Sequence, residues 1–98
     1  MSALDKRVAI VTGASSGIGR ATALRLAGEG ATVIALARRG DRLAELEQAN
    51  PRISGVVCDV GDHEMLAKSV EQTVSQHGGI DILVNNAGVG YLFGLLTE

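Results

Sequence analysis

The sequence predicts an α/β protein of three layers, in which helices cover both faces of a doubly wound parallel sheet. Two observations lead to this prediction. Short apolar runs rich in β-branched residues alternate along the chain with longer stretches of helical periodicity, and glycine stands at most of the changeovers. Within each short run the apolar residues follow one another without alternation, which is typical of parallel strands that are buried on both faces.

Four of these runs are predicted strands. They fall at residues 8–11, 33–36, 53–58 and 80–84. Because crossovers between parallel strands are right-handed and short, the strand order 3-2-1-4 is expected. No internal repeat or long linker interrupts the pattern, so a single domain is predicted to fill the chain.

Three helices are predicted between the strands. The first carries Ile18, Ala21, Leu24, Leu26 and Ala27 and ends at Gly28 or Gly30. In the second, Asp41 can cap a short helix that must stop before Pro51. The third follows Asp62, repeats apolar or small residues at 65, 66, 69, 70, 73 and 74, and ends at Gly78. This last pattern indicates a helix that covers one face of the sheet.

Composition excludes several classes of function. The 98 residues carry a formal net charge of -2 and only 2% aromatic residues, which gives no basis for nucleic-acid or anionic-membrane binding. No apolar run approaches the roughly 18 residues of a membrane span, and no signal peptide is recognisable, so a soluble cytoplasmic protein is expected. The single cysteine, Cys58, shares no ligand spacing with His63 or His77, and no metal site is predicted.

Glycines cluster in the segment Thr12 to Gly19, Thr-Gly-Ala-Ser-Ser-Gly-Ile-Gly, between the first predicted strand and helix. The amides of a helix's first turn and its macrodipole can bind a diphosphate at such a corner. The spacing matches neither the G-x-G-x-x-G fingerprint nor the P-loop, which requires Lys-Ser or Lys-Thr. A structural turn that binds nothing is the alternative interpretation.

This loop resembles the T-G-x-x-x-G-x-G motif of the short-chain dehydrogenase/reductase family. Three further segments agree with it: Asp59-Val60 after the third strand, Asp81 to Val84 as the fourth, and Asn85-Asn86-Ala87-Gly88 after it. The resemblance implies a Rossmann-type sheet. It also implies that residues 1–98 form the dinucleotide-binding half-domain, with only the first four strands, and end before the catalytic segment.

The same resemblance assigns the cofactor-binding residues. The phosphates would be surrounded by Gly13, Gly17, Ile18 and Gly19, and Ser15 and Ser16 of the same loop would also belong to the cofactor site, Ser15 as an added hydroxyl donor. The adenine would meet Asp59 and Val60, and the riboses would be flanked by Asn86, Ala87 and Gly88. The Thr12 hydroxyl would brace the neighbouring loop through Asn86. For Asp59 a structural role as a turn or helix-start acid is the alternative.

The end of the second strand predicts the cofactor. An NAD site places an acidic residue about 20 residues beyond the glycine loop, whereas an NADP site supplies a cation for the 2'-phosphate. Here Ala37 carries no carboxylate, and Arg38 and Arg39 follow it. Some relatives have a basic residue at the position of Ser16, so these two arginines would be the main anchors. NADP(H) is therefore favoured over NAD(H); the alternatives are two solvated arginines, or Asp41 as a ribose-binding acid.

The resemblance implies hydride transfer between the cofactor and a small alcohol or carbonyl substrate. The family's catalytic Ser and Tyr-x-x-x-Lys are not found: Tyr91 is followed four positions later by Leu95, and no catalytic residue is predicted. A non-catalytic NADP-binding module is the alternative. Because the fourth strand would be an apolar edge, the chain is expected to associate, as a homo-oligomer or with a completing segment.

Overall fold

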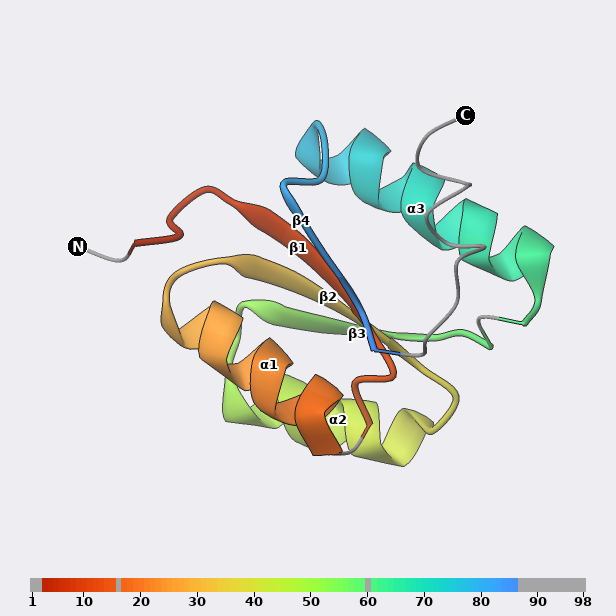
Figure 1. The fold of residues 1–98 in the computed structure, drawn as a ribbon, viewed down its shortest axis with the longest axis horizontal. Coiled ribbons are helices and arrows are strands. Elements are labelled where there is room, and N and C mark those ends of the chain that lie inside the picture. The colour runs from red at the N-terminus through yellow and green to blue at the C-terminus, as the bar shows by residue number, and fades with distance from the viewer. Residues whose placement is uncertain (1–2, 16, 60, 87–98) are drawn as a thin grey trace.

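The computed structural model describes residues 3–15, 17–59 and 61–86, and its ribbon shows a sheet between helices (Figure 1). The elements are β1 (Val8–Thr12), α1 (Gly17–Gly28), β2 (Thr32–Ala37), α2 (Gly40–Ala49), β3 (Ile53–Val57), α3 (His63–His77) and β4 (Ile82–Asn85). All strand pairs are parallel, and the order in the sheet is β3-β2-β1-β4. The predicted fold class and strand order are confirmed.

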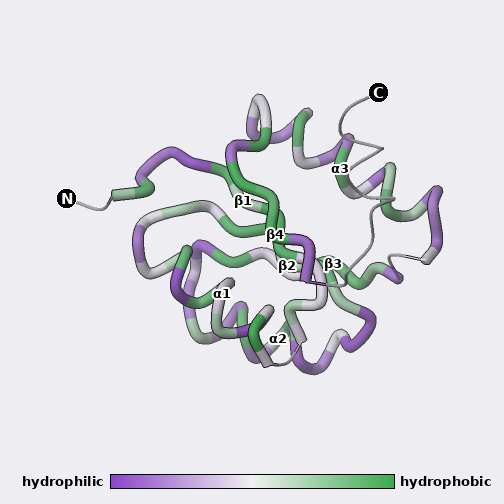
Figure 2. Tube along the Cα trace, viewed as in Figure 1, coloured by the Kyte–Doolittle hydropathy of each residue, from purple (hydrophilic) through white to green (hydrophobic). Residues whose placement is uncertain are grey.

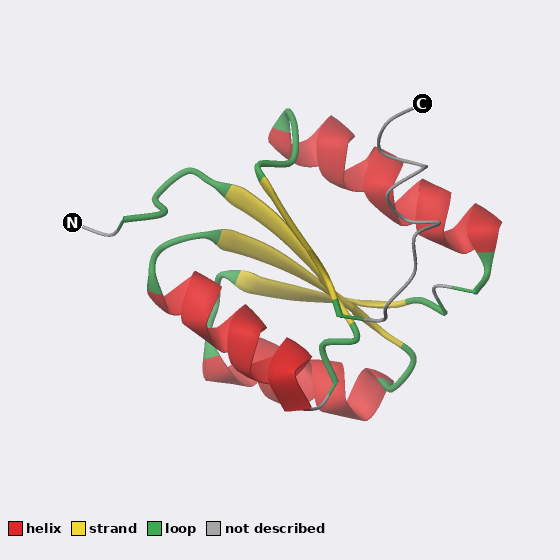
Figure 3. Ribbon diagram, in the orientation of Figure 1, coloured by secondary structure: helices red, strands yellow, loops and turns green. Residues whose placement is uncertain are grey.

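The helices lie on both faces of the sheet. α1 and α2 cover one face and α3 covers the other (Figure 3). Successive side chains of a strand point to opposite faces, so Val11 and Val33 pack toward α1 and α2, while Ile10 and Ile34 pack toward α3. The apolar strands accordingly run through the middle of the molecule (Figure 2).

α1 packs in part through the predicted residues, since Ala27 is buried and Leu24 and Leu26 pack against the core, but two of the predicted residues face outward. Ile18 is 75% exposed and Ala21 is also exposed, whereas Gly19, Ala23 and Ala27 are buried. These three residues are spaced by four, so they form one small-residue stripe along the helix. The small residues of this stripe face the sheet, and the larger Ile18 does not, because small side chains allow the helix backbone to approach the sheet closely.

α2 begins two residues earlier than an Asp41 cap would require. Arg39 occupies the N-cap position without a side-chain cap hydrogen bond, and Asp41 lies inside the first turn. The predicted cap is therefore wrong. The predicted end is confirmed, because the helix stops at Ala49 and Asn50 is extended before Pro51.

α3 has the predicted bounds. Asp62 caps its N-terminus by accepting a hydrogen bond from the backbone N–H of Met65 at 3.1 Å, and Gly78 ends it with a left-handed φ of 83°. Leu66 is fully buried, whereas Met65 and Val74 lie at the margin and are 41% and 44% exposed.

Asp81 aligns β4 with β1. Its Oδ2 accepts a hydrogen bond from the backbone N–H of Val8 at 2.8 Å, and its own N–H donates to the carbonyl oxygen of Val8 at 2.8 Å. β4 consequently begins at Ile82 rather than at residue 80.

Within the described residues β4 pairs only with β1, and the expected homo-oligomer stays a prediction. None of the helices described is long and apolar enough to cross a membrane; the cytoplasmic location stays a prediction.

The packing of α3 can be tested with neighbouring residues. In the full-length protein, Leu66→Ala is expected to lower the free energy of unfolding by about 2–5 kcal/mol, because it leaves a cavity under α3. Met65→Ala, one position away but largely exposed, should cost less than about 1 kcal/mol. Urea denaturation measures both, and equal losses would contradict the packing of α3 on the sheet.

Candidate functional site

A pocket of about 430 Å³ opens where three parallel strands end. It is lined by residues from the loops after β1, β2 and β3: Gly13, Ser15, Leu36, Ala37, Arg38, Arg39, Cys58 and Asp59. The carboxyl edge of an open parallel sheet is where such folds bind ligands. Five of the predicted site residues, from three separate segments, therefore line one cavity.

The glycine loop turns sharply between β1 and α1. Gly13 and Gly17 have φ values of 63° and 58°, a left-handed conformation that glycine adopts without steric cost. Between them Ala14 is buried, and its backbone N–H donates to the carbonyl oxygen of Leu36 at 3.2 Å. This bond ties the loop to the end of β2 and so sets the distance between the loop and the arginines.

Gly19 allows the first turn of α1 to pack against two loops. A Cβ at this position would collide with the carbonyl oxygen of Gly13 and lie 2.8 Å from Nδ2 of Asn86. Nδ2 of Asn86 in turn donates to the carbonyl oxygen of Gly13 at 3.4 Å. The loop after β4 thus joins the other three at the carboxyl edge of the sheet.

The neighbouring Thr12 contacts the first asparagine of the pair. Its hydroxyl donates to Oδ1 of Asn85 at 3.2 Å and lies 3.4 Å from the carbonyl oxygen of Val84. The sequence suggested a brace through Asn86. The bond to Asn85 was missed because it depends on the register of β1 against β4, which pairs Thr12 with Asn85.

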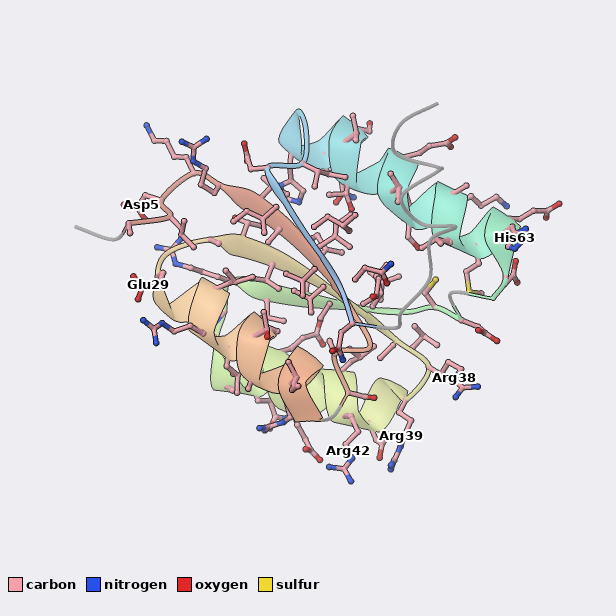
Figure 4. The ribbon with its side chains drawn as sticks, viewed as in Figure 1. Asp5, Glu29, Arg38, Arg39, Arg42 and His63 are labelled. Atoms are coloured by element: carbon pink, nitrogen blue, oxygen red, sulfur yellow. The ribbon has the colours of Figure 1, made fainter. Side chains whose placement is uncertain are left out.

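The two arginines after β2 differ in their surroundings. Arg38 is exposed and has no hydrogen-bond or ion-pair partner in residues 3–15, 17–59 and 61–86. Nη2 of Arg39 lies 2.9 Å from Oδ2 of Asp41, and this hydrogen bond holds the pKa of the Asp41 carboxyl below its ordinary value. The two side chains leave the loop in different directions (Figure 4). Asp41 does not line the pocket, which disfavours it as a ribose-binding acid.

Asp59 has the turn role that was considered as the alternative, and it also lines the pocket. It is exposed at the pocket, and its Oδ1 accepts a hydrogen bond from the backbone N–H of Gly61 at 2.9 Å, as in an Asx turn. Its Oδ2 has no partner within the described part of the chain. The carboxylate therefore orders its own loop and still presents one oxygen to the pocket.

Cys58 forms a wall of the pocket. It is a free thiol, 1% exposed, and burial raises its pKa. Neither Cys58 nor Leu36 was singled out from the sequence as a residue of the site. Their position at the carboxyl ends of strands was the signal that could have placed them at the pocket.

The remaining predicted residues are placed only in part. Gly17, Ile18 and Gly19 form the first turn of α1, outside the residues that line the pocket. Ser16, Val60, Ala87 and Gly88 lie outside the described residues. Among the residues described, no group of three or more His, Cys, Asp or Glu side chains is arranged to hold a metal ion.

The family model for short chain dehydrogenases matches residues 7–96 of this sequence. The chain belongs to the short-chain dehydrogenase family. Among its relatives, a farnesol dehydrogenase of Aedes aegypti is 46% identical over 88 residues, which cover 85% of this chain and 36% of the relative. A 3beta-hydroxysteroid dehydrogenase of Mediterraneibacter gnavus is 39% identical over 93 residues, 91% of this chain and 34% of the relative.

Solved structures of the family have the same fold. A metagenomic short-chain oxidoreductase, crystallised in complex with NADP, superposes with a TM-score of 0.84 at 39% identity, covering 91% of this chain and 42% of that one. The chain spans about a third of the length of the farnesol dehydrogenase and of the 3beta-hydroxysteroid dehydrogenase. Short-chain dehydrogenases are nicotinamide-dependent oxidoreductases, and the pocket of this chain lies at the carboxyl edge of the sheet, where open α/β folds bind ligands.

The close packing at Gly19 gives a stability prediction. Gly19→Ala is expected to lower the free energy of unfolding by about 1–3 kcal/mol, because the methyl group collides with backbone that must shift. Gly28→Ala, on the same helix with no atom near the added Cβ, is the matched control. It should leave stability unchanged or raise it by up to about 1 kcal/mol. Denaturant titration compares them, and a harmless Gly19→Ala would refute this packing.

Proposed function

We propose that this chain supplies the cofactor-binding part of an NADP(H)-dependent short-chain dehydrogenase that interconverts a small alcohol and its carbonyl compound. One observation carries the NADP(H) preference. At the end of β2, Ala37 offers no carboxylate to ribose hydroxyls, while Arg38, whose guanidinium has no partner among the described residues, lines the pocket. Family membership supports the oxidoreductase activity.

The diphosphate would bind at the first turn of α1. A Cβ placed on Gly17 would have no heavy atom within 4 Å, so the space beside this turn is open. The backbone amides at the helix start have no partner within the helix, and the macrodipole adds partial positive charge there. The Ser15 hydroxyl lines the pocket that Arg38 also lines, and it can add a donor. These features fit a diphosphate.

The adenosine would lie along the ends of β2 and β3. Arg38 can donate two parallel hydrogen bonds to a 2'-phosphate, which is the geometry that favours arginine over lysine. The free Oδ2 of Asp59 can accept a hydrogen bond from the adenine amino group. Leu36 and Cys58 provide an apolar wall for the ring. The proposal also includes the contacts expected from the sequence, which are Val60 with the adenine and Ala87 and Gly88 with the riboses.

When bound, the nicotinamide ring supplies a hydride to a carbonyl carbon or accepts one from an alcohol. The residues of this chain bind and orient the cofactor for that step. No described residue is proposed as the proton donor. The loop after β4 is tied to Gly13 through Asn86, and it would hold the nicotinamide side of the dinucleotide near the glycine loop.

The role of Arg38 is tested by cofactor affinity in the full-length protein. Arg38→Ala is expected to raise the Kd for NADPH by about 10- to 100-fold, because charge-assisted hydrogen bonds to the phosphate are lost. The Kd for NADH should change little. Arg25→Ala, which removes the same charge at the far end of α1, is the control. Tighter binding of NADH than of NADPH by the unmodified protein would contradict the cofactor assignment.

A pair of glycines tests the diphosphate site. Gly17→Ala and Gly78→Ala both place a side chain at a positive φ with open space around it, so each should cost about 1–2 kcal/mol of stability. Only Gly17 is at the proposed site. We expect Gly17→Ala to weaken the binding of NADPH and NADH by about tenfold or more, because the added methyl group would occupy the open space beside the turn and keep the diphosphate away from the backbone amides. Fluorescence titration would oppose the proposal if both variants bound normally.

A further inference from the structure

The loop between β2 and α2 presents two arginines, but only one of them is free. Both line the pocket, and Arg38 has no partner in the described ranges. Arg39 instead donates from Nη2 to Oδ2 of Asp41 at 2.9 Å. A phosphate that binds here would therefore find one guanidinium available and one already engaged.

The position of Asp41 follows from the start of α2. It stands in the first turn of the helix, where the macrodipole stabilises a negative charge. Arg39, at the N-cap of the same helix, is two residues away and makes no cap of its own. Helix geometry thus keeps the carboxylate close to the loop that carries both arginines.

The Arg39–Asp41 pair is accessible to solvent. The side chains are 58% and 64% exposed, so water and salt screen the attraction and the pair itself contributes little to stability. The pair nevertheless affects the binding of an anion at this loop. The carboxylate both competes with the anion for Arg39 and repels it.

We infer that Asp41 is a specificity-determining residue: by holding Arg39, it limits the affinity of the pocket for the 2'-phosphate of NADP(H). Arg38 is then the principal anchor, and Arg39 reaches the phosphate only when it leaves Asp41. The inference rests on the proposed function. It adds that the strength of the NADP(H) preference is set by an acidic residue outside the pocket, which does not itself bind the ribose.

The charges around the pair define the control. Arg42 follows Asp41 on α2 and projects near Arg39 (Figure 4), while Glu45 lies one turn further along the same helix. Glu45 has no ion pair in the part of the chain described. Glu45→Gln therefore removes the same charge from the same helix without releasing an arginine.

The experiment measures dissociation constants for NADPH, NADH and 2',5'-ADP in the full-length protein and its variants. Asp41→Asn should lower the dissociation constants for NADPH and 2',5'-ADP by about fivefold at low salt, as expected for removing one exposed charge near a phosphate dianion. NADH affinity should stay the same. Glu45→Gln should have less than half this effect on a logarithmic scale, and higher salt should reduce the gain.

The double variant Arg39→Ala with Asp41→Asn identifies the source of the gain. If Asp41 acts by holding Arg39, the double variant loses most of the tightening seen in Asp41→Asn. A gain that persists without Arg39 would overturn that mechanism. Unchanged or weaker NADPH binding in Asp41→Asn would overturn the inference, and weaker NADH binding would show that Asp41 serves the ribose.

Failure of this inference and failure of the proposed function give different results. If Arg38→Ala weakens NADPH but Asp41→Asn has no effect, the cofactor assignment stands and the inference about Asp41 falls. If the unmodified protein binds NADH more tightly than NADPH, or if Arg38→Ala has no effect, the cofactor assignment itself falls. Circular dichroism confirms that each variant keeps its helices.

Discussion

The close approach of α1 to the end of β1 is the constraint on which the site depends. Gly19 has no room for a side chain because the carbonyl oxygen of Gly13 occupies that space, and Asn86 donates to the same oxygen. This contact fixes where the helix starts and therefore where its unpaired first-turn amides lie. The small-residue stripe of Gly19, Ala23 and Ala27 extends the approach along the sheet.

From this fixed corner the sheet brings the other loops into reach. Parallel strands end at one edge, so segments distant in sequence supply a hydroxyl, two guanidiniums and a carboxylate to one pocket. The charges there are not equivalent. Among the described residues Arg38 lines the pocket without a partner, whereas Arg39 is paired with Asp41, so counting basic residues overstates the positive charge that is available to a phosphate.

The family match and the pocket at the sheet edge are separate observations, and each supports a different part of the proposed function. The family match extends over residues 7–96, and the relatives named above are about three times as long as this chain. Cofactor binding by this chain is part of the proposed function. Substrate recognition and proton transfer belong to the proposal for the whole protein, whereas the pocket at the sheet edge is a property of these residues.

The strand order could be predicted from the order of the apolar runs, because crossovers between parallel strands are right-handed. The end of α2 before Pro51, the end of α3 at Gly78 and the glycine turn could be predicted because the residues that end helices and form turns act locally. The buried face of α1 and the partners of Arg39 and Thr12 could not be predicted in this way. Those outcomes depend on how closely separate segments approach and in which direction their side chains point. Local spacing along the chain contains neither quantity.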